Sequence, residues 1–210
     1  MKRLAVLASG RGSNLRALIE AERRGELGAR IVLVVSNRRA APALALAEAA
    51  GIERDVVRLR DFPARSDWDR ALAERLRRDE VELVACAGFG LILGPAMLEA
   101  FAGRILNVHP SLLPSFGGGL HAQADALAHG VKVSGCTVHL VDDQLDAGPI
   151  VLQRAVVVDE DDDVGSLTAR ILAEEHRALP EAVRLLAEGR LRVEGRRVRI
   201  EPVGVGVYGG

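Results

Sequence analysis

The chain has 210 residues, 49% of them hydrophobic, which is enough to bury a core and excludes a disordered polypeptide. Its 28 Lys and Arg residues nearly balance its 29 Asp and Glu residues. The net charge of -1 therefore gives no general attraction to nucleic acid or to an anionic membrane. One Trp and one Tyr leave little material for a base-stacking platform, so we expect small-molecule partners.

Short apolar runs alternate with longer amphipathic stretches over the first half of the chain. They predict strands at residues 4–8, 31–36, 55–59, 81–87 and 105–109, and helices at residues 13–24, 41–50, 68–78 and 95–100. Most of these strands lack apolar/polar alternation, which indicates a parallel sheet covered by helices on both faces. This alternation of strands and helices predicts a Rossmann-like, doubly wound α/β fold with a mostly parallel sheet.

The pattern changes beyond residue 130. Residues 133–141 and 150–158 are two predicted strands with no helix between them, so we expect an antiparallel C-terminal extension of the sheet. An acidic run at 159–163 should be a solvated loop. A long amphipathic helix begins near Val164, and Pro180 is expected to kink it or to start a second helix.

The end of the chain predicts a hairpin from residues 191–193 and 198–200, followed by a frayed tail from Gly204. No internal repeat and no Pro/Ser-rich linker divides the sequence. We therefore expect one domain over residues 1–210, with a nucleotide- or phosphate-binding half at about 1–100.

The two cysteines, Cys86 and Cys136, each lie in an apolar run and are expected to be buried, reduced thiols. No zinc spacing and no disulfide framework is present in the sequence. The N-terminal apolar run is too short for a signal peptide, and no run is long enough to cross a bilayer. We therefore expect a cytoplasmic protein with no membrane partner and no metal.

A glycine-rich turn, from Ser9 to Asn14, follows the first predicted strand directly. Glycines at a strand-to-helix turn let backbone N–H groups approach an anion, and the helix N-terminus adds the positive end of its dipole. The turn lacks the third glycine of a dinucleotide fingerprint and the lysine of a Walker loop. It is therefore either a phosphate site or a tight turn capped by Ser13.

Asn107 and His109 stand two residues apart at the end of a predicted strand. Side chains with this spacing share one face, so both should point to the carboxyl edge of the sheet, where open α/β sheets bind ligands. A carboxamide can donate to a developing oxyanion, and an imidazole can carry a proton near neutral pH. We interpret the pair as catalytic, with a structural histidine as the alternative.

Three carboxylates, Asp142, Asp143 and Asp146, lie in the loop between the two later strands. One of them can orient His109 and favour its charged form, although the residues alone leave open which one does so. The alternative is a solvated turn, since Asp and Gly are favoured there. The Pro- and Gly-rich segment at 111–121 is expected to face a substrate, with a plain connector as the alternative.

Together these segments resemble the phosphoribosylglycinamide formyltransferase family of purine synthesis, over nearly the whole chain. The resemblance is carried by Ser-Gly-Arg-Gly-Ser-Asn at 9–14, Ala-Gly-Phe at 87–89, Asn-Val-His-Pro-Ser-Leu-Leu-Pro at 107–114, Gly-Leu-His at 119–121, Thr-Val-His at 137–139 and Leu-Asp-Ala-Gly-Pro at 145–149. It implies the formyltransferase fold, with a catalytic and folate-binding half at about 101–200. It also implies a formyl donor, 10-formyltetrahydrofolate, and an acceptor, the amine of 5-phosphoribosyl-glycinamide.

The resemblance also implies roles for individual residues, in a monomer or weak homodimer. The family's catalytic trio matches Asn107, His109 and Asp146, and its acceptor site matches Gly12, Ser13, Asn14 and Glu175. The folate pocket matches Arg65, Gly90, Leu91, Ile92, Leu93, Asn107, Val141 and Asp142. By this resemblance, Asn107 and protonated His109 stabilise the oxyanion formed when the amine attacks the formyl carbon, and Asp146 keeps His109 charged.

The sequence departs from the family at three places. Gly90 and Leu91 stand where many members carry Met and Arg, which can alter donor preference. The glycine run at 117–119 is one residue longer than the usual Pro-Gly step, and Ser115 replaces a lysine of some relatives.

Other functions remain open from the sequence. Within the superfamily the alternatives are methionyl-tRNA formyltransferase, a sugar-nucleotide formyltransferase and formyltetrahydrofolate deformylase, which usually carry further domains. An alternative of another class is a noncatalytic phosphate- or nucleotide-binding module. That module predicts no close approach of Asp146 to His109.

Overall fold

The structure, a computed structural model, describes residues 1–202. Strands and helices alternate as far as α5, whereas β6 pairs with β7, and β8 with β9, without a helix between the two strands of each pair. In chain order the elements are β1 (Lys2–Leu7), α1 (Ser13–Arg23), β2 (Ala29–Ser36), α2 (Pro42–Ala49), β3 (Glu53–Val56), the 3-10 turn η1 (Leu59–Asp61), α3 (Arg65–Arg78), β4 (Leu83–Cys86), α4 (Pro95–Ala100), β5 (Ile105–His109), α5 (Ala122–His129), β6 (Val133–Leu140), β7 (Ile150–Val157), α6 (Val164–Ala187), β8 (Leu191–Glu194) and β9 (Arg197–Ile200).

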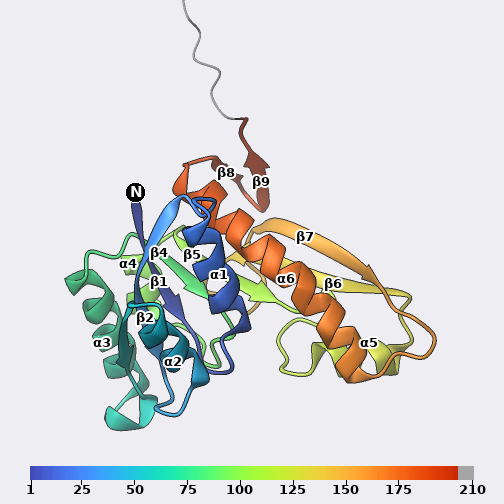
Figure 1. Cartoon of the computed structure of the whole chain (residues 1–210), viewed down its shortest axis with the longest axis horizontal. Coiled ribbons are helices and arrows are strands. Elements are labelled where there is room, and N and C mark those ends of the chain that lie inside the picture. Colours follow the sequence, from blue (N-terminus) through green and yellow to red (C-terminus); the bar gives the residue numbers. More distant parts are fainter. Residues whose placement is uncertain (203–210) are drawn as a thin grey trace, which may run out of the picture.

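Within residues 1–202, nine strands form one sheet in the order β3-β2-β1-β4-β5-β6-β7-β9-β8 (Figure 1). Strands β1 to β5 run parallel to one another, and β6 runs antiparallel to both β5 and β7. The β8–β9 hairpin joins the sheet through a parallel pairing of Arg197 with Ile150. The predicted doubly wound, mostly parallel sheet with an antiparallel C-terminal extension is confirmed.

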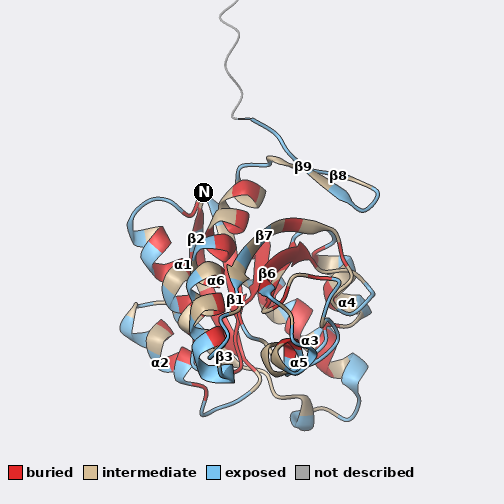
Figure 2. Cartoon of the chain, turned by 90° about the vertical axis from the view of Figure 1, so that its right-hand side faces the viewer, coloured by how far each residue is buried: buried red, intermediate tan, exposed pale blue. Residues whose placement is uncertain are grey.

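Helices cover both faces of the sheet, as the strand patterns predict. Helices α1, α2 and α6 pack on one face, and α3 and α4 pack on the other. Strand β1 serves both cores, because Leu4 and Val6 face the first group while Ala5 and Leu7 face the second. Figure 2 shows buried residues, in red, along the central strands of the sheet, with the β8–β9 hairpin projecting from the body.

Two predicted elements have different bounds in the structure. The strand expected at residues 55–59 is β3, which begins earlier because Glu53 pairs with Leu33 at the end of the ladder. Its predicted end is wrong, since Leu59 lies in η1 and packs its side chain against the core on the α3 side. The polar start of β3 carries no apolar pattern that would identify it as a strand.

Pro180 does not start a second helix, because it lies inside α6, which runs for 24 residues from Val164 to Ala187. A proline inside a helix costs roughly 3 kcal/mol. Burial of the neighbouring Leu179 and Val183 against the sheet contributes roughly 1.5–3 kcal/mol for each side chain, which offsets that cost. The frayed tail expected from Gly204 lies outside the described residues.

The tight turn after β1 is not capped by Ser13, so the predicted cap is wrong. The N-cap of α1 is Gly12, with a left-handed φ of 79° and no side-chain cap. A Cβ at Gly12 would lie 3.0 Å from the Cα of Ala43, so both the backbone conformation and the close approach of α2 require glycine here.

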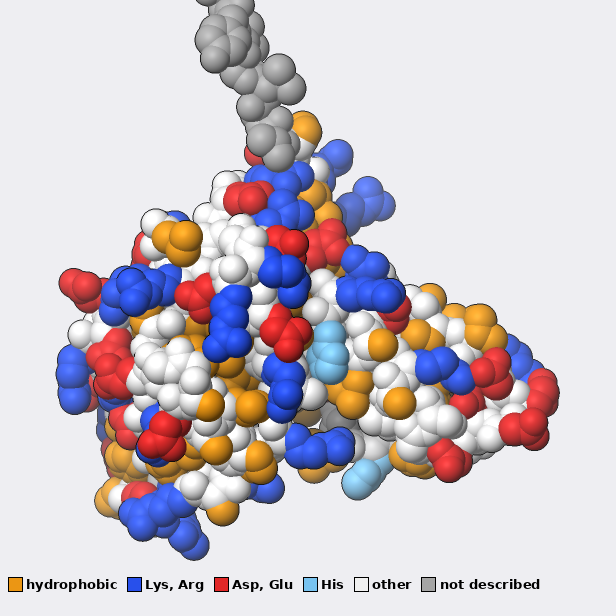
Figure 3. All heavy atoms as spheres, viewed as in Figure 1, with side chains coloured by type: hydrophobic (Ala, Val, Ile, Leu, Met, Phe, Trp, Pro, Cys, Tyr) orange, Lys and Arg blue, Asp and Glu red, His pale blue; other side chains and the backbone are white. Residues whose placement is uncertain are grey.

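The surface over α1 and α6 carries interspersed charges of both signs (Figure 3). The acidic run at 159–163 forms the largely exposed turn between β7 and α6, as predicted. Its Asp159 and Asp162 both pair with Arg170 of α6. Among the helices of residues 1–202, none has the length and apolar character to span a membrane.

Candidate active site

The loops that follow β1, β4 and β5 meet at one edge of the sheet, because these strands are parallel neighbours. The first two loops are joined by hydrogen bonds. The Ser9 N–H donates to the Gly88 carbonyl at 3.0 Å, and the Gly90 N–H donates to Ser9 Oγ at 2.7 Å. The predicted candidate residues of these loops are therefore brought together at the carboxyl ends of the strands, the usual ligand position in such sheets.

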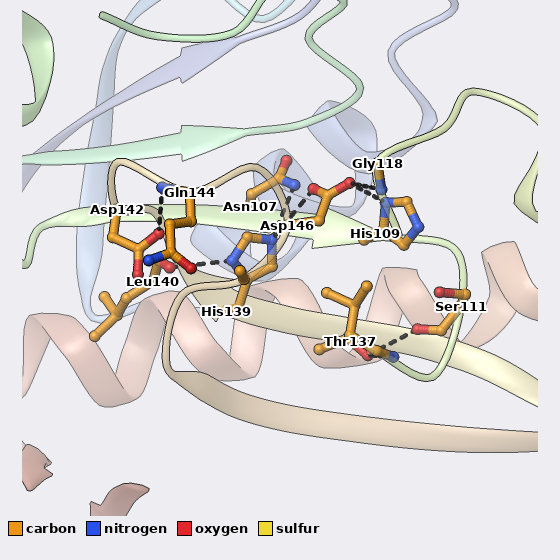
Figure 4. A network of polar contacts seen from close by, with 12 residues as sticks. Asn107, His109, Ser111, Gly118, Thr137, His139, Leu140, Asp142, Gln144 and Asp146 are labelled. Carbon is orange, nitrogen blue, oxygen red and sulfur yellow. Dashed lines mark hydrogen bonds and ion pairs between the residues drawn. The ribbon is translucent and has the colours of Figure 1, made fainter. Parts of the chain in front are cut away.

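His109 is buried at the end of β5, and Asp146 lies beside one of its ring nitrogens (Figure 4). Its Nε2 lies 3.0 Å from the Phe116 carbonyl oxygen, and its Nδ1 lies 3.3 Å from Asp146 Oδ2. A carbonyl only accepts, so Nε2 must carry a hydrogen. With a carboxylate at the other nitrogen, the pocket has acceptors for both N–H groups of an imidazolium.

Asp146 is the carboxylate that reaches His109. The residues alone left this choice open, and the family resemblance implied Asp146. Its side chain is 11% exposed, and Oδ2 also accepts a hydrogen bond from the Gly118 N–H at 2.9 Å. Asp142 instead accepts from the Gln144 N–H within its own loop. The 3.3 Å approach to His109 contradicts the expectation of the noncatalytic module.

Both partners of His109 lie on strained backbone. Asp146 has a φ of 51° and Phe116 a φ of 56°, in the left-handed region that non-glycine residues seldom adopt. Such conformations cost free energy and persist where the surrounding structure determines them, which is common at functional sites. Here the strain places one acceptor on each side of the His109 ring.

Asn107 is held by a side chain from the neighbouring strand, His139 of β6. The two residues are paired directly across the antiparallel ladder, and Asn107 Nδ2 lies 3.2 Å from His139 Nε2. The other ring nitrogen, Nδ1, lies 3.0 Å from the Leu140 carbonyl and must donate to it. In the neutral ring Nε2 is therefore an acceptor, which turns the amide N–H of Asn107 toward His139.

Burial of His139 lowers its pKa from the ordinary value of 6.5, against opposing effects of the Leu140 hydrogen bond and the nearby Asp146 charge. The neutral tautomer that orients Asn107 is therefore favoured. His139 Nε2 also lies 3.8 Å from Asp146 Oδ1, so one chain of contacts runs from Asn107 through His139 and Asp146 to His109 (Figure 4).

His139 had no role predicted from the sequence, although a signal was present. Along β6 the apolar Cys136, Val138 and Leu140 alternate with Thr137 and His139, which places both polar residues on the opposite face. Recognising that this face meets Asn107 requires the β5–β6 register, which the sequence pattern does not give.

Thr137 fixes the start of the segment at 111–121. Its hydroxyl donates to the Ser111 carbonyl at 2.7 Å and accepts from the Leu113 N–H at 2.9 Å. Gln153 of β7 adds a hydrogen bond to the Leu113 carbonyl at 2.9 Å. The segment therefore leaves β5 in a defined direction, and its glycines arrive over Asp146.

The residues expected to bind the acceptor meet at the start of α1. Asn14 Nδ2 donates to Glu175 Oε2 of α6 at 2.7 Å, and both side chains are buried. Burial raises the pKa of Glu175, and the Asn14 hydrogen bond acts in the opposite direction. The Oδ1 of Asn14 is buried without a hydrogen-bond partner in residues 1–202, an arrangement that suits a donor group from a ligand.

The residues expected to line the folate pocket lie on α3, on β5 and on the two loops that follow β4 and β6. The Arg65 guanidinium donates to the Ile92 carbonyl, which fixes the segment after β4. In this segment Leu93 is buried and Ile92 is exposed. On the second loop, the Val141 N–H donates to the Ile105 carbonyl at 2.9 Å, directly before Asp142.

Comparison with known proteins places this site in a family context. The family model described as "Formyl transferase" matches residues 2–183. The chain is 48% identical to phosphoribosylglycinamide formyltransferase of Mycobacterium tuberculosis (strain H37Rv) over 204 residues, covering 94% of each protein. It superposes on glycinamide ribonucleotide transformylase 1 from Symbiobacterium toebii with a TM-score of 0.94 and 52% identity, covering 96% of this chain and 95% of that one.

Larger proteins contain a similar segment. The chain is 48% identical over 193 residues to the trifunctional purine biosynthetic protein adenosine-3 of Drosophila pseudoobscura, where the match covers 91% of this chain. It spans only 14% of the length of that relative.

Proposed function

The chain belongs to the formyl transferase family, and on this basis we propose that it transfers the formyl group of 10-formyltetrahydrofolate to the amine of 5-phosphoribosyl-glycinamide. The product is 5-phosphoribosyl-N-formylglycinamide. The observation that carries this proposal is the contact chain of Asn107, His139, Asp146 and His109 at the carboxyl edge of the sheet.

The first step is attack of the amine nitrogen on the formyl carbon, which forms a tetrahedral oxyanion. Asn107 is suited to stabilise this oxygen, because His139 holds one amide N–H and the amide carries a second. A preorganised donor of this kind is typically worth about 2.7–4 kcal/mol of barrier.

The second donor is the His109 imidazolium. In the present arrangement its Nε2–H donates to the Phe116 carbonyl, and its Nδ1 faces Asp146. Binding of the substrate oxygen therefore requires one ring N–H to exchange its protein acceptor for the oxyanion. Asp146 stabilises the charged ring during this exchange, as an opposite charge at short distance does.

Breakdown of the intermediate needs two proton movements. The attacking nitrogen must lose a proton, and the folate nitrogen must gain one as its bond to the formyl carbon breaks. Asp146 is the group that we assign to proton handling, through a bound water, because its carboxylate faces both histidines.

The proposed acceptor site lies at the start of α1. We assign the phosphate and ribose to Gly12, Ser13, Asn14 and Glu175. The backbone N–H groups at a helix N-terminus suit the phosphate. The unpartnered Asn14 Oδ1 and the Glu175 carboxyl group suit ribose hydroxyls, which donate as well as accept.

The donor site uses residues of α3 and β5 and of the loops that follow β4 and β6. We assign the folate to Arg65, Gly90, Leu91, Ile92, Leu93, Asn107, Val141 and Asp142. The contacts of Gly90 with Ser9 and of Ile92 with Arg65 support this assignment, because they hold the segment at the same edge as the acceptor site.

We further propose one catalytic domain that works in the cytoplasm as a monomer or weak homodimer. The single sheet that joins both halves supports the domain assignment. So does the Asn14–Glu175 hydrogen bond, which links the proposed phosphate-binding half to the catalytic half.

Steady-state kinetics with the two proposed substrates test the function. We expect deformylation of the donor that depends on the acceptor, with stoichiometric appearance of the formylated amide. Donor hydrolysis at the same rate without acceptor would instead identify a deformylase. Binding of both ligands without turnover would identify a noncatalytic module.

A further inference from the structure

The segment from Gly88 to Met97 runs from the end of β4 into the first turn of α4 and carries Gly90 to Leu93, which we assign to the formyl donor. Its position at the sheet edge is therefore a condition of donor binding, if the proposed function holds. Helix α3 packs beside this segment on the same face of the sheet (Figure 1). The side chains of α3 are thus placed to set where the segment lies.

Asp69 of α3 is a buried carboxylate directed entirely at this segment. It is 1% exposed, and its oxygens accept three backbone N–H groups: Gly94 at 2.7 Å, Ala96 at 2.8 Å and Met97 at 3.2 Å. A buried charge is costly unless it is paired or hydrogen-bonded. These three contacts therefore account for the presence of an acid in the α3 core.

Helix α4 depends on this carboxylate for its N-terminal cap. Its own N-cap residue is Gly94, which has no side chain, and Pro95 follows without an N–H. A Cβ at Gly94 would lie 2.7 Å from Asp69 Oδ2 and 2.8 Å from its Cγ. The cap is therefore supplied from α3, and glycine at position 94 leaves room for it.

Two other α3 side chains hold the same segment. The Arg65 guanidinium donates to the Ile92 carbonyl, and the Trp68 ring stacks on Phe89 with centroids 6.4 Å apart and planes at 12°. Arg65, Trp68 and Asp69 share one face of the helix, at spacings of three and four residues. One face of α3 therefore contacts the 88–97 segment near its start, in its middle and at its end.

We propose that Asp69 is a positioning residue for the formyl donor. It does not touch substrate. Its carboxylate fixes the end of the 88–97 segment, and so sets where Gly90 to Leu93 stand relative to Asn107. The acceptor site at Asn14 and Glu175 has no contact with Asp69, so the effect should be confined to the donor.

The test is the isosteric change Asp69→Asn, which replaces one accepting oxygen with an NH2 group, so that in either amide orientation at least one of the three backbone N–H groups faces a donor. The expected result is a rise of about tenfold or more in the KM for the formyl donor, since about 1.4 kcal/mol of lost binding free energy is a factor of ten in affinity. The KM for the acceptor, and kcat at saturating donor, should remain close to those of the unchanged protein.

Gly94→Ala tests the same contact from the segment. It keeps the carboxylate but adds a methyl group that would lie 2.7 Å from Asp69 Oδ2, so the segment must shift. We therefore expect this variant also to raise the KM for the donor selectively. This variant keeps the proposal falsifiable if Asp69→Asn does not fold. Asp163→Ala is the matched control, because Asp163 caps α6 through the Ser166 N–H at 2.7 Å, away from the donor segment.

A direct binding readout uses the single tryptophan, Trp68, which packs on Phe89 of the segment. Its fluorescence should follow titration with 10-formylfolate, a stable analogue of the donor, and show a weaker Kd in both variants. Hydrogen exchange should rise selectively at residues 90–97.

Equal rises in both substrate KM values, or an unchanged donor Kd in folded Asp69→Asn and Gly94→Ala, would overturn the proposal. If the protein without substitutions shows no formyl transfer, the proposed function fails. In that case a selective loss of 10-formylfolate binding in the two variants would still support the role of Asp69 in positioning the donor segment.

Discussion

His139 provides a sharp prediction because its closest side-chain contact in the site, at 3.2 Å, is with Asn107. In His139→Leu the ring acceptor is lost while most of the side-chain volume remains. The Asn107 amide then loses the 3.2 Å contact that orients it, and both amide orientations become accessible. Losing one neutral hydrogen bond, or leaving a buried N–H unsatisfied, costs roughly 1–3 kcal/mol.

That range corresponds to a fall of about 5- to 150-fold in kcat, because each 1.36 kcal/mol is a factor of ten in rate. Asn107→Ala removes the oxyanion donor itself and should cost about 100- to 1000-fold. In the His139→Gln variant the amide oxygen can still accept from Asn107, so part of the loss should be recovered.

The assay is kcat at saturating concentrations of both substrates for the two single variants and the double variant. If His139 acts through Asn107, adding His139→Leu to Asn107→Ala should change kcat little further, since contacting residues are not additive. Full turnover in folded His139→Leu, or an effect that persists undiminished in the Asn107→Ala background, would refute this role of His139.

His109, Asp146 and Glu175, and the pH dependence of His139, give four more expected outcomes. His109→Ala should lower kcat by about 100-fold or more with an unchanged circular dichroism spectrum, and near-normal turnover in the folded variant would refute its catalytic role. Asp146→Asn should lower kcat and leave the acceptor KM unchanged; a variant defective only in acceptor binding would remove Asp146 from proton handling. When the Tm is measured above pH 7, Glu175→Gln should have a higher Tm than the unchanged protein, and its KM for the acceptor should also be higher. Burial raises the pKa of Glu175 above 4.5, so the folded chain loses stability as the pH rises through that pKa, and a lower Tm for the variant would contradict this reasoning. Burial lowers the pKa of His139 below 6.5. The stability that the neutral ring contributes is therefore complete above pH 6.5 and is lost as the pH falls through the lowered pKa. If the Tm of His139→Gln fell with acid as steeply as that of the unchanged protein, the lowered pKa of His139 would be contradicted.

The fold was accessible from the sequence where burial alone determines the pattern. Strands β1, β2, β4 and β5 are apolar runs because helices cover both faces, and their positions were predicted within a few residues. Strand β3 lies at the edge of the sheet and begins with Glu53 and Arg54, so its start had no apolar signal. At Pro180 the local preference was overridden by packing along α6.

Residues of the site were accessible where chemistry and spacing coincide. Asn107 and His109 share a strand end, which made them recognisable as a pair. The choice of Asp146 over Asp142 depends on a left-handed backbone at Asp146, which no sequence pattern indicated. Asp69 could not be identified either, because its partners lie 25 to 28 residues away and meet it only once α3 and α4 pack together.

Formyl transfer itself is tested by following the formyl carbon. With 10-formyltetrahydrofolate labelled with carbon-13 in the formyl group, and 5-phosphoribosyl-glycinamide as acceptor, NMR should show the label moving into an amide of the acceptor. The label should appear there in equal amount to the tetrahydrofolate released. Appearance of the label as free formate, with the acceptor amine unchanged, would contradict formyl transfer.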